Sequence, residues 1–470
     1  MHRKRGYGML VAVLAAALLL SACSSVELEA PKGQLRLYLG PEPAAIDPAL
    51  VEDRTSAQVA ELLFLGLTNL NDQTLEAEPE LAERWESAAD GATWTFHLRK
   101  DIRWVRYAQG RFAVKRPVTA RDVVYAVRRA LSARQALPGA ELLYVVRNAR
   151  AFHDGELAAS EALGVRAVGD DVVQFDLERP LANFPVLAGL PPFRPLPREL
   201  VEQAGERWTE PENVWTNGPY ALASWEHGST LTVERNPRYT GTEAASIGRV
   251  TCVLGEDERA AFDRYVEGEL DVCLVPADRV KEVRADKRLA PELRLAPELR
   301  TEYYGFNGSR PPFDRPQVRR ALSLALDRAR LVEAVLQGQG LPARSLGAPG
   351  ALDSPAGDPA FAGVGYDPDG ARKLLAEAGY PGGKGLPPVT LVVNDDAQAA
   401  AVAEWVRQAW QETLGVDVQV ERRPWRAHYD AIVANAPQVF RLPMAAGYPA
   451  ESAWLREGLA RFERAFGYPA

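Results

Sequence analysis

Short runs of alternating polar and apolar residues recur along the chain, which is the pattern of strands with one buried face. Residues 215–239 (WTNGPYALASWEHGSTLTVERNPRY) hold two such runs, separated by Gly228-Ser229 and ended by Asn236-Pro237. Because these residues favour tight turns, the segment predicts a β-hairpin. Further strands are predicted at residues 34–39, 93–98, 172–177, 249–254, 269–276, 389–394 and 416–422.

Apolar residues spaced three and four apart predict helices between these strands, at residues 55–64, 257–267 and 397–414. One amphipathic helix is also predicted between Asp314 as its cap and Gly338 as its stop. Thr119 should cap another helix, with its hydroxyl accepting a backbone N–H. The proline-rich residues 184–197 predict an irregular connection rather than a helix. The alternation of strands and helices indicates an α/β fold.

The amino terminus has the pattern of a targeting segment. Arg3, Lys4 and Arg5 precede an uncharged apolar run at residues 9–20, and Leu-Ser-Ala-Cys follows at once. The run is shorter than the roughly 20 apolar residues that a membrane span needs. Residues 1–22 are therefore predicted to be a lipoprotein signal peptide, with Cys23 as the lipidated first residue and 23–32 as a tether. An ordinary secretory signal that happens to contain a cysteine is the alternative.

The chain is acidic, with a formal net charge of −8. Loss of the leader removes three of its 55 basic residues, and 52 basic against 63 acidic side chains then give about −11. Nucleic acid and anionic lipid are unfavourable partners for such a chain, because binding either needs a basic face. The hydrophobic fraction of 47% and the length allow two or three domains with cores of their own.

Two cysteines remain after the leader. Cys252 and Cys273 fall in two predicted strands joined by a helix, a βαβ unit. Side-by-side parallel strands rarely offer disulfide geometry, so two buried thiols are favoured over a bridge. No histidine lies near them, and the pair does not form a zinc motif.

Enzyme motifs are absent from the sequence. It contains no GxSxG, HExxH or GxxxxGK[ST]. The five histidines are scattered, and Asp367-Pro-Asp-Gly370 lacks the remaining acidic ligands of a calcium loop. We therefore expect no catalytic residues, no metal site and no cofactor.

Several phrases resemble one protein family. They are NGPY…ERNPRY at 217–239, GLTNL…PELAERW…DGATWTFHLRKDIRW at 66–104, PVTARDVVY at 117–125 and YVEGELDVCLVP at 265–276. Together they are similar to the family 5 extracellular solute-binding proteins of peptide-importing ABC transporters, over about residues 33–455. Residues 107–115 stand where that family usually has an Asp-Gly turn before PVTA.

The resemblance implies a two-lobed periplasmic-binding-protein-like α/β fold with a hinge cleft between the lobes. It places the first lobe at 33–250 with an inserted subdomain at about 100–200, the second lobe at 251–445, and a short carboxyl-terminal segment at 446–470. It further implies an exported, monomeric, lipid-anchored protein, not an enzyme. Such a protein captures oligopeptides and delivers them to a membrane permease.

The resemblance also assigns ligand contacts, at Glu42, Cys273, Leu274, Val275, Trp425, Tyr448 and Glu451. One departure concerns the ligand's ammonium group, which the family binds through an aspartate in a motif of the form ADY. Gly447 stands in place of that acid here, beside Tyr448. Glu451 is the candidate replacement, because a buried ammonium needs a nearby carboxylate.

Two alternatives stay open. The missing aspartate would suit a ligand without an α-ammonium group, such as a nickel chelate, haem or a sugar. A protein of a different class, a sensor or chaperone-like lipoprotein without a transport role, is the second alternative. The family's closing segment of the first lobe is expected to be truncated here, so that either this lobe manages without it or the chain is a paralogue with weakened binding. A secreted hydrolase would need a catalytic cluster that the sequence does not display.

Overall fold

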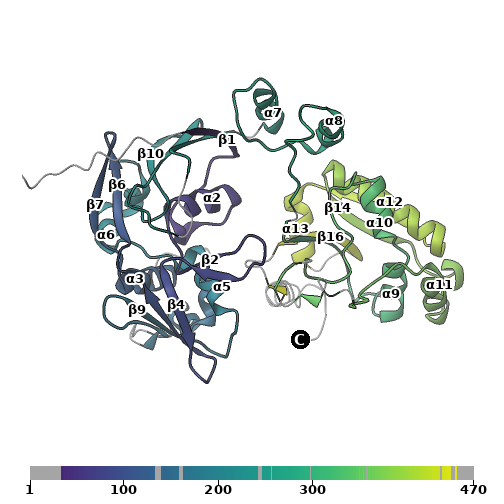
Figure 1. Ribbon diagram of the computed structural model, residues 1–470. Helices are drawn as coiled ribbons and strands as arrows, with labels where there is room; N and C mark the ends of the chain where they lie inside the picture. Colours follow the sequence, from purple (N-terminus) through teal and green to yellow (C-terminus); the bar gives the residue numbers. More distant parts are fainter. Residues whose placement is uncertain are drawn as a thin grey trace, which may run out of the picture. The chain divides into compact units, whose positions relative to one another are not determined.

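The computed structural model describes residues 33–451, apart from 133–138, 158–161, 242–245, 256, 297, 349, 353, 356–357, 359, 435–436 and 446–449. The expectations for the leader, Cys23, Gly447 and Tyr448 therefore lie outside the described residues. The chain divides into two compact units. Figure 1 labels the helices and strands that build them. Of the described residues, unit 1 takes 33–64, 99–122 and 196–274, and unit 2 takes 65–98, 123–195 and 275–451.

Unit 1 is built on a four-stranded sheet in the order β1 (Gln34–Gly40), β12 (Arg249–Leu254), β11 (Thr230–Arg235) and β10 (Tyr220–Glu226). β1 and β12 are parallel, and the other two pairs are antiparallel. The predicted hairpin is confirmed as β10 and β11. The expected boundary between residues 250 and 251 falls inside β12, whose hydrogen bonds to β1 and β11 keep it in unit 1.

Helices and a second hairpin complete unit 1. They are η1 (Pro48–Leu50), α2 (Arg54–Leu63), α6 (Arg198–Ala204), η5 (Gly205–Thr209), α7 (Glu258–Val266) and the antiparallel pair β6 (Arg103–Ala108) and β7 (Arg111–Pro117). Asp53 caps α2 by accepting from Ser56 N at 2.8 Å. The buried Trp208 packs on Phe64 and donates its indole N–H to Asp47 at 2.9 Å. Its polar atom is thereby satisfied inside the core.

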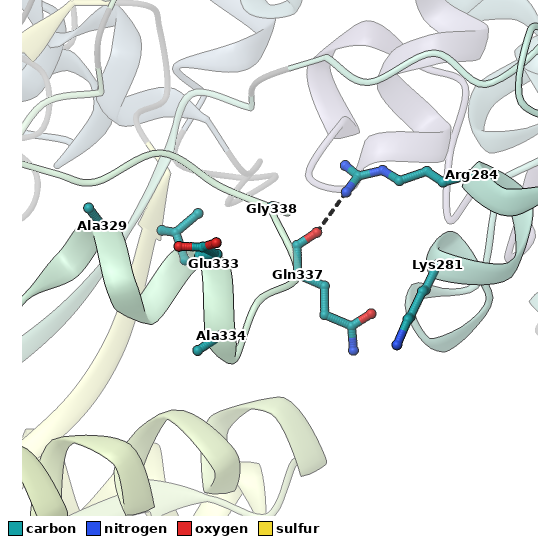
Figure 2. A pocket seen from close by; sticks show the side chains of 8 residues that line it. Lys281, Arg284, Ala329, Glu333, Ala334, Gln337 and Gly338 are labelled. Carbon is teal, nitrogen blue, oxygen red and sulfur yellow. Dashed lines mark hydrogen bonds between the residues drawn. The ribbon is translucent and has the colours of Figure 1, made fainter.

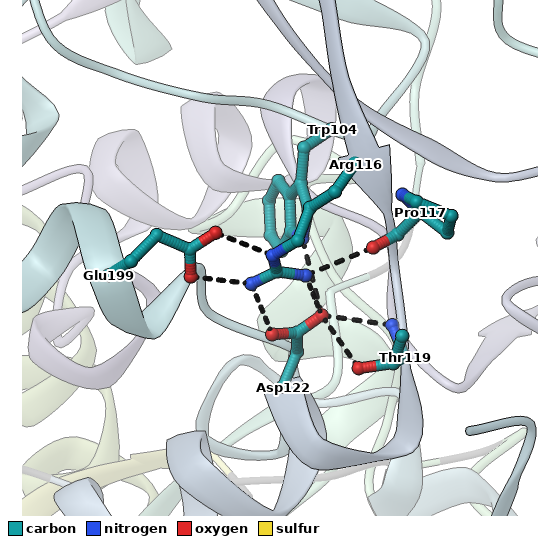
Figure 3. A network of polar contacts seen from close by, with 6 residues as sticks. All are labelled: Trp104, Arg116, Pro117, Thr119, Asp122 and Glu199. Atoms are coloured by element: carbon teal, nitrogen blue, oxygen red, sulfur yellow. Dashed lines mark hydrogen bonds and ion pairs between the residues drawn. The ribbon is translucent and has the colours of Figure 1, made fainter.

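A charged network joins β7, α6 and the start of α3 (Ala120–Ala130), as Figure 3 shows. The Arg116 guanidinium makes two hydrogen bonds of 2.7 Å to Asp122 and two, of 2.5 and 2.7 Å, to Glu199. The buried Asp122 carboxylate also accepts from Trp104 Nε1 and from Thr119 N. The expected role of the Thr119 hydroxyl is wrong, because it donates to Asp122 at 3.3 Å instead of accepting a backbone N–H.

The first part of unit 2 holds two sheets. One is the pair β2 (Thr68–Leu70) and β3 (Ala77–Pro79); the other runs β4 (Ala82–Ser87), β5 (Thr93–Leu98), β9 (Val172–Asp176) and β8 (Val165–Ala167), all antiparallel. Its other elements are η2 (Ala140–Val145), α4 (Ala149–His153), α5 (Phe184–Ala188) and η4 (Pro191–Phe193). Four fully buried phenylalanines form its core: Phe96, Phe175, Phe184 and Phe193.

The irregular connection expected at residues 184–197 is wrong at its start. Residues 184–188 form α5, and Pro185 lies in the first turn, where a missing N–H costs no hydrogen bond. The predicted long helix after Asp314 is also wrong in part. It is divided into α9 (Pro316–Leu324) and α10 (Arg328–Ala334), because Asp327 accepts from Arg330 N and starts a new helix.

The second part of unit 2 has a sheet in the order β13 (Arg300–Phe306), β16 (Val439–Ala445), β14 (Val389–Asn394) and β15 (Val418–Arg423). Val389, Leu391 and Val393 share a core with Trp410, and with residues of α9, α11 (Pro368–Glu377) and α12 (Ala397–Leu414). Phe440 and Leu442 point to the opposite face and meet α13 (Trp425–Val433). Successive strand residues thus serve two cores. The remaining short elements are η6 (Ala277–Arg279), α8 (Val280–Ala285) and η8 (Pro381–Gly383).

Candidate functional site

The predicted contact residues Cys273, Leu274 and Val275 follow a single bridge rather than lying in a full strand. Residues 269–276 pair with β1 only at Leu37 and Val272, where Tyr38 N donates to Val272 O at 2.9 Å. The adjoining Asp271 carboxylate accepts three hydrogen bonds from Arg36. The three candidate side chains are all half-buried. They are therefore available for contact, on an extended segment held to β1 by the Arg36–Asp271 ion pair and by backbone hydrogen bonds at Arg36 and Tyr38.

The two thiols are free, as expected. The reason differs from the expected one, because Leu37 of β1 pairs with Cys252 on one side and with Val272 on the other. A whole strand thus separates the two cysteines, at a distance of about two strand spacings, or roughly 10 Å. Burial raises the pKa of each thiol to about 11.

The Glu42 carboxylate is engaged by the β10–β11 turn within unit 1. One oxygen lies 2.6 Å from Nδ1 of His227, and the other accepts from Gly228 N at 3.0 Å. Both oxygens hold the loop after β1 against the hairpin. The 185-residue separation between Glu42 and His227 explains why sequence patterns gave no sign of this contact.

Trp425 opens α13, and its side chain is 49% exposed. Its ring centroid lies 6.1 Å from those of His428 and Tyr429. Since Ile432 of the same helix is buried against β16, α13 is fixed while the indole stays accessible. Unit 2 therefore presents one accessible indole ring on a helix that is fixed by its buried side.

A charged cluster that the sequence did not reveal lies near Trp425, with Arg441 buried and Glu302 exposed. Arg441 of β16 donates two hydrogen bonds, of 2.7 and 2.6 Å, to Glu302 of β13 and a third to Asn394 of β14. His428 is fully buried, with Nε2 at 2.7 Å from the Arg441 carbonyl oxygen. Burial lowers the pKa of His428, so the ring is neutral and Nε2 donates. The only sequence signal was one arginine in an apolar strand.

Glu451 carries a carboxylate that is buried and only half satisfied. The residue is 7% exposed, and its Oε1 accepts from Gly347 N at 3.2 Å. Its Oε2 is buried and has no hydrogen-bond partner among the described residues. The backbone of Gly347 approaches so closely that a Cβ there would lie 2.8 Å from the Glu451 carboxyl carbon.

The neighbours of Glu451 that the structure describes include a small apolar core and a neutral tyrosine. Ala348 and Ala351 form a small core beside Tyr303 and Met444. Burial raises the pKa of Tyr303 to about 12, with the Glu451 charge adding a smaller contribution. The Tyr303 hydroxyl donates to Leu346 O. A carboxylate in this setting favours a cationic group as its missing partner.

A separate open hollow of about 620 Å³ lies between α8 and α10 (Figure 2). Arg284 bounds it and donates to Gln337 O at 2.8 Å, where Gln337 and Gly338 both have positive φ. Most of its lining side chains are exposed, and none is a predicted contact residue. Its lining consists of Lys281, Arg284, Ala329, Val332, Glu333, Ala334, Gln337 and Gly338.

In the described part of the chain, no group of three or more His, Cys, Asp or Glu side chains is placed so that it could hold a metal ion. Over the same residues, no helix combines the length and apolar character that crossing a bilayer demands.

The sequence matches a family model described as bacterial extracellular solute-binding proteins, family 5, over residues 76–460. The periplasmic oligopeptide-binding protein OppA of Salmonella typhimurium is 32% identical over 96% of this chain and 82% of its own. The probable deoxycholate-binding periplasmic protein YgiS of Escherichia coli is 31% identical, over 91% and 78%. A crystal structure of the Borrelia burgdorferi oligopeptide-binding protein OppAIV has a TM-score of 0.69 at 26% identity, over 93% and 85%.

Proposed function

The chain belongs to the bacterial extracellular solute-binding proteins, family 5, and on that premise we propose that it captures oligopeptides and delivers them to the permease of an ABC importer. The family and the α/β, two-lobed binding-protein fold predicted from the sequence are both confirmed. The observation that carries the proposal is the 32% identity to an oligopeptide-binding protein over 96% of the chain. Enclosure of the ligand between the lobes stays a prediction.

We assign the ligand's ammonium group to Glu451. An ionised carboxylate away from water is costly unless it is paired, and its Oε2 has no partner among the described residues. A peptide's amino terminus supplies a cation with three N–H donors. Trp425, half exposed on α13, would lie along the peptide and contact side chains of any sequence. In this proposal, Glu451 replaces the aspartate that the family has at the position of Gly447.

The other predicted contacts enter the proposal in different ways. Cys273, Leu274 and Val275 lie on an extended segment that could pair with a ligand backbone. Glu42 holds the β10–β11 turn through both carboxylate oxygens, so it would support the site rather than bind the ligand. Tyr448 stays a prediction from the sequence.

We further propose that the protein is exported and anchored through a lipid on Cys23. The support is the leader pattern of residues 1–22 and the periplasmic location named for its relatives. Mass spectrometry of the membrane fraction tests this. A diacylated amino-terminal cysteine is expected, and an unmodified chain would argue for an ordinary secretory signal.

A second candidate is a non-peptide ligand, favoured by one observation. The deoxycholate-binding relative is as similar to this chain as the oligopeptide-binding one, at 31% against 32% identity. An anionic steroid would place no cation at Glu451. The two candidates therefore differ in the charge of the ligand.

Tryptophan fluorescence titrations of the ligand-free protein separate these candidates. We expect a saturable change with tripeptides that have a free amino terminus, and none with deoxycholate. Saturation by deoxycholate with no response to peptides would assign the second candidate. A protein whose fluorescence changes with neither ligand would count against both candidates and favour a sensor without a transport role.

A further inference from the structure

We propose that the β6–β7 hairpin of unit 1 is a docking face for anionic lipid headgroups. Residues 103–117 contain five basic and no acidic side chains, in a chain whose overall net charge is −8. Charges interact in physiological salt over only about 8 Å, so a local basic face can bind although the whole chain is acidic. The hairpin contains residues 107–115, where the sequence departs from the family pattern.

The register of the hairpin gathers three of these cations on one face. Ala108 pairs with Arg111 and Arg106 pairs with Ala113. Alternation along the strands then puts Arg106, Arg111 and Lys115 on the same side, as diagonal neighbours about 7–8 Å apart. The opposite side carries Tyr107 and Phe112, whose rings pack at 4.9 Å.

The hairpin does not neutralise these charges. Arg106, Arg111 and Lys115 have no ion pair and no side-chain hydrogen bond to any described residue, and Arg106 Nε is buried without a partner. The neighbouring Arg116 shows the contrast, because Asp122 and Glu199 both pair with it. Like charges at such spacing repel one another, so an external anion would relieve the repulsion among the cations on this strand pair.

A lipid surface suits this face better than a compact ligand does. The small side chains of Ala108 and Ala113 lie among the cations on this face, where Arg111 is exposed and Arg106 and Lys115 are half-buried. Lys115 Nζ lies 5.2 Å above the half-exposed ring of Trp215, and tryptophan favours the headgroup region of a bilayer. Figure 1 shows β6 and β7 beside α6 at the edge of unit 1. The hairpin also has an exposed tip at Gln109 and Gly110.

Vesicle sedimentation tests the proposal with the protein from residue 24 onward, which retains every described residue but carries no lipid. We expect binding to vesicles of phosphatidylglycerol and phosphatidylcholine, weakening as salt rises, and no binding to phosphatidylcholine alone. The variant Arg106→Gln/Arg111→Gln/Lys115→Gln should bind about a hundredfold more weakly. That factor corresponds to about 1 kcal/mol for each basic residue near an anionic surface.

The matched control is Lys281→Gln/Lys373→Gln/Lys384→Gln, which removes the same charge from exposed sites on unit 2. It should bind the vesicles as the unmodified protein does. The hairpin variant should unfold at a temperature close to that of the unmodified protein, because the lost repulsion offsets the lost contact of Lys115 with the Trp215 ring. Absence of binding by the unmodified protein at low salt would overturn the proposal, as would equal weakening of both variants. The first result would leave an acidic protein surface as the partner of this face.

Discussion

Glu451→Gln should separate the stability of the protein from its affinity for peptides. The glutamine keeps the carbonyl oxygen that accepts from Gly347 N and replaces the buried, unpartnered Oε2 by a neutral amide. If Oε2 binds a ligand cation, the ligand-free protein is destabilised by the desolvation of this unpaired carboxylate oxygen. The ligand-bound protein instead gains an ion pair.

The magnitudes follow from burial. An unsatisfied buried polar atom costs about 1–3 kcal/mol and a charged one costs more, so replacing the charge by a neutral amide removes part of that cost. The ligand-free variant should therefore be more stable by about 1–2 kcal/mol, or about 2–4 °C in Tm for each kcal/mol in a unit of this size. Loss of one partner of a buried charge pair costs about 2–5 kcal/mol, so the affinity for a tripeptide should fall on the order of a hundredfold.

Two measurements are needed, each with a matched control. Thermal unfolding is followed on protein stripped of ligand by unfolding and refolding, and binding is measured with a tripeptide and its amino-acetylated form. Glu377→Gln removes an exposed carboxylate from α11 and should change neither quantity. The unmodified protein should prefer the free amine, and Glu451→Gln should bind both forms equally.

The opposite pattern would refute the reasoning. If Glu451→Gln lowers Tm and leaves the preference for the free amine intact, the carboxylate has a structural partner and the ammonium group binds elsewhere.

Three further predictions follow from single contacts. Arg116→Ala should lower the urea unfolding free energy by about 3 kcal/mol, since Asp122 stays buried without its cation. The Arg116 hydrogen bonds also hold the pKa of Glu199 below its usual value, so the stabilisation from the Arg116–Glu199 pair is present at neutral pH and is lost as pH falls through the lowered pKa. The variant's stability should therefore depend less on acid pH, and an unchanged profile would contradict the assignment. Gly347→Ala should weaken peptide binding by displacing the Glu451 carboxylate, whereas Gly365→Ala, with open space around it, should not. Reducing agent should leave Tm unchanged and Cys252 should resist alkylation at pH 8 until the protein unfolds, whereas a lower Tm in reductant would reveal a bridge.

Much of the secondary structure could be predicted because it depends on local patterns. The strand at 389–394 and the helix at 397–414 match β14 and α12, since a period-two run, an aspartate cap and a helical period follow one another there. The hairpin of β10 and β11 was marked by its turn residues. The break at Asp327 was missed because an apolar stripe continues on both sides of it.

Long-range pairing is what the sequence could not reveal. β1 lies between β12 and Val272, which the βαβ pattern placed side by side, and so the physical reason given for the free thiols was incomplete. The contacts Glu42–His227, Arg441–Glu302 and Glu451–Gly347 each join residues more than 100 positions apart. The residues next to each of these side chains in the sequence do not indicate the contact, because the partner lies far away in the chain.

Native mass spectrometry of the protein from residue 24 onward, purified gently from cells, tests the central claim most directly. The account predicts a ladder of bound masses that leaves on partial unfolding and fragments into peptides. Two results would contradict the assignment of this chain as an oligopeptide receptor. One is a single bound mass that is not a peptide, and the other is a folded, ligand-free protein that binds nothing from a peptide mixture.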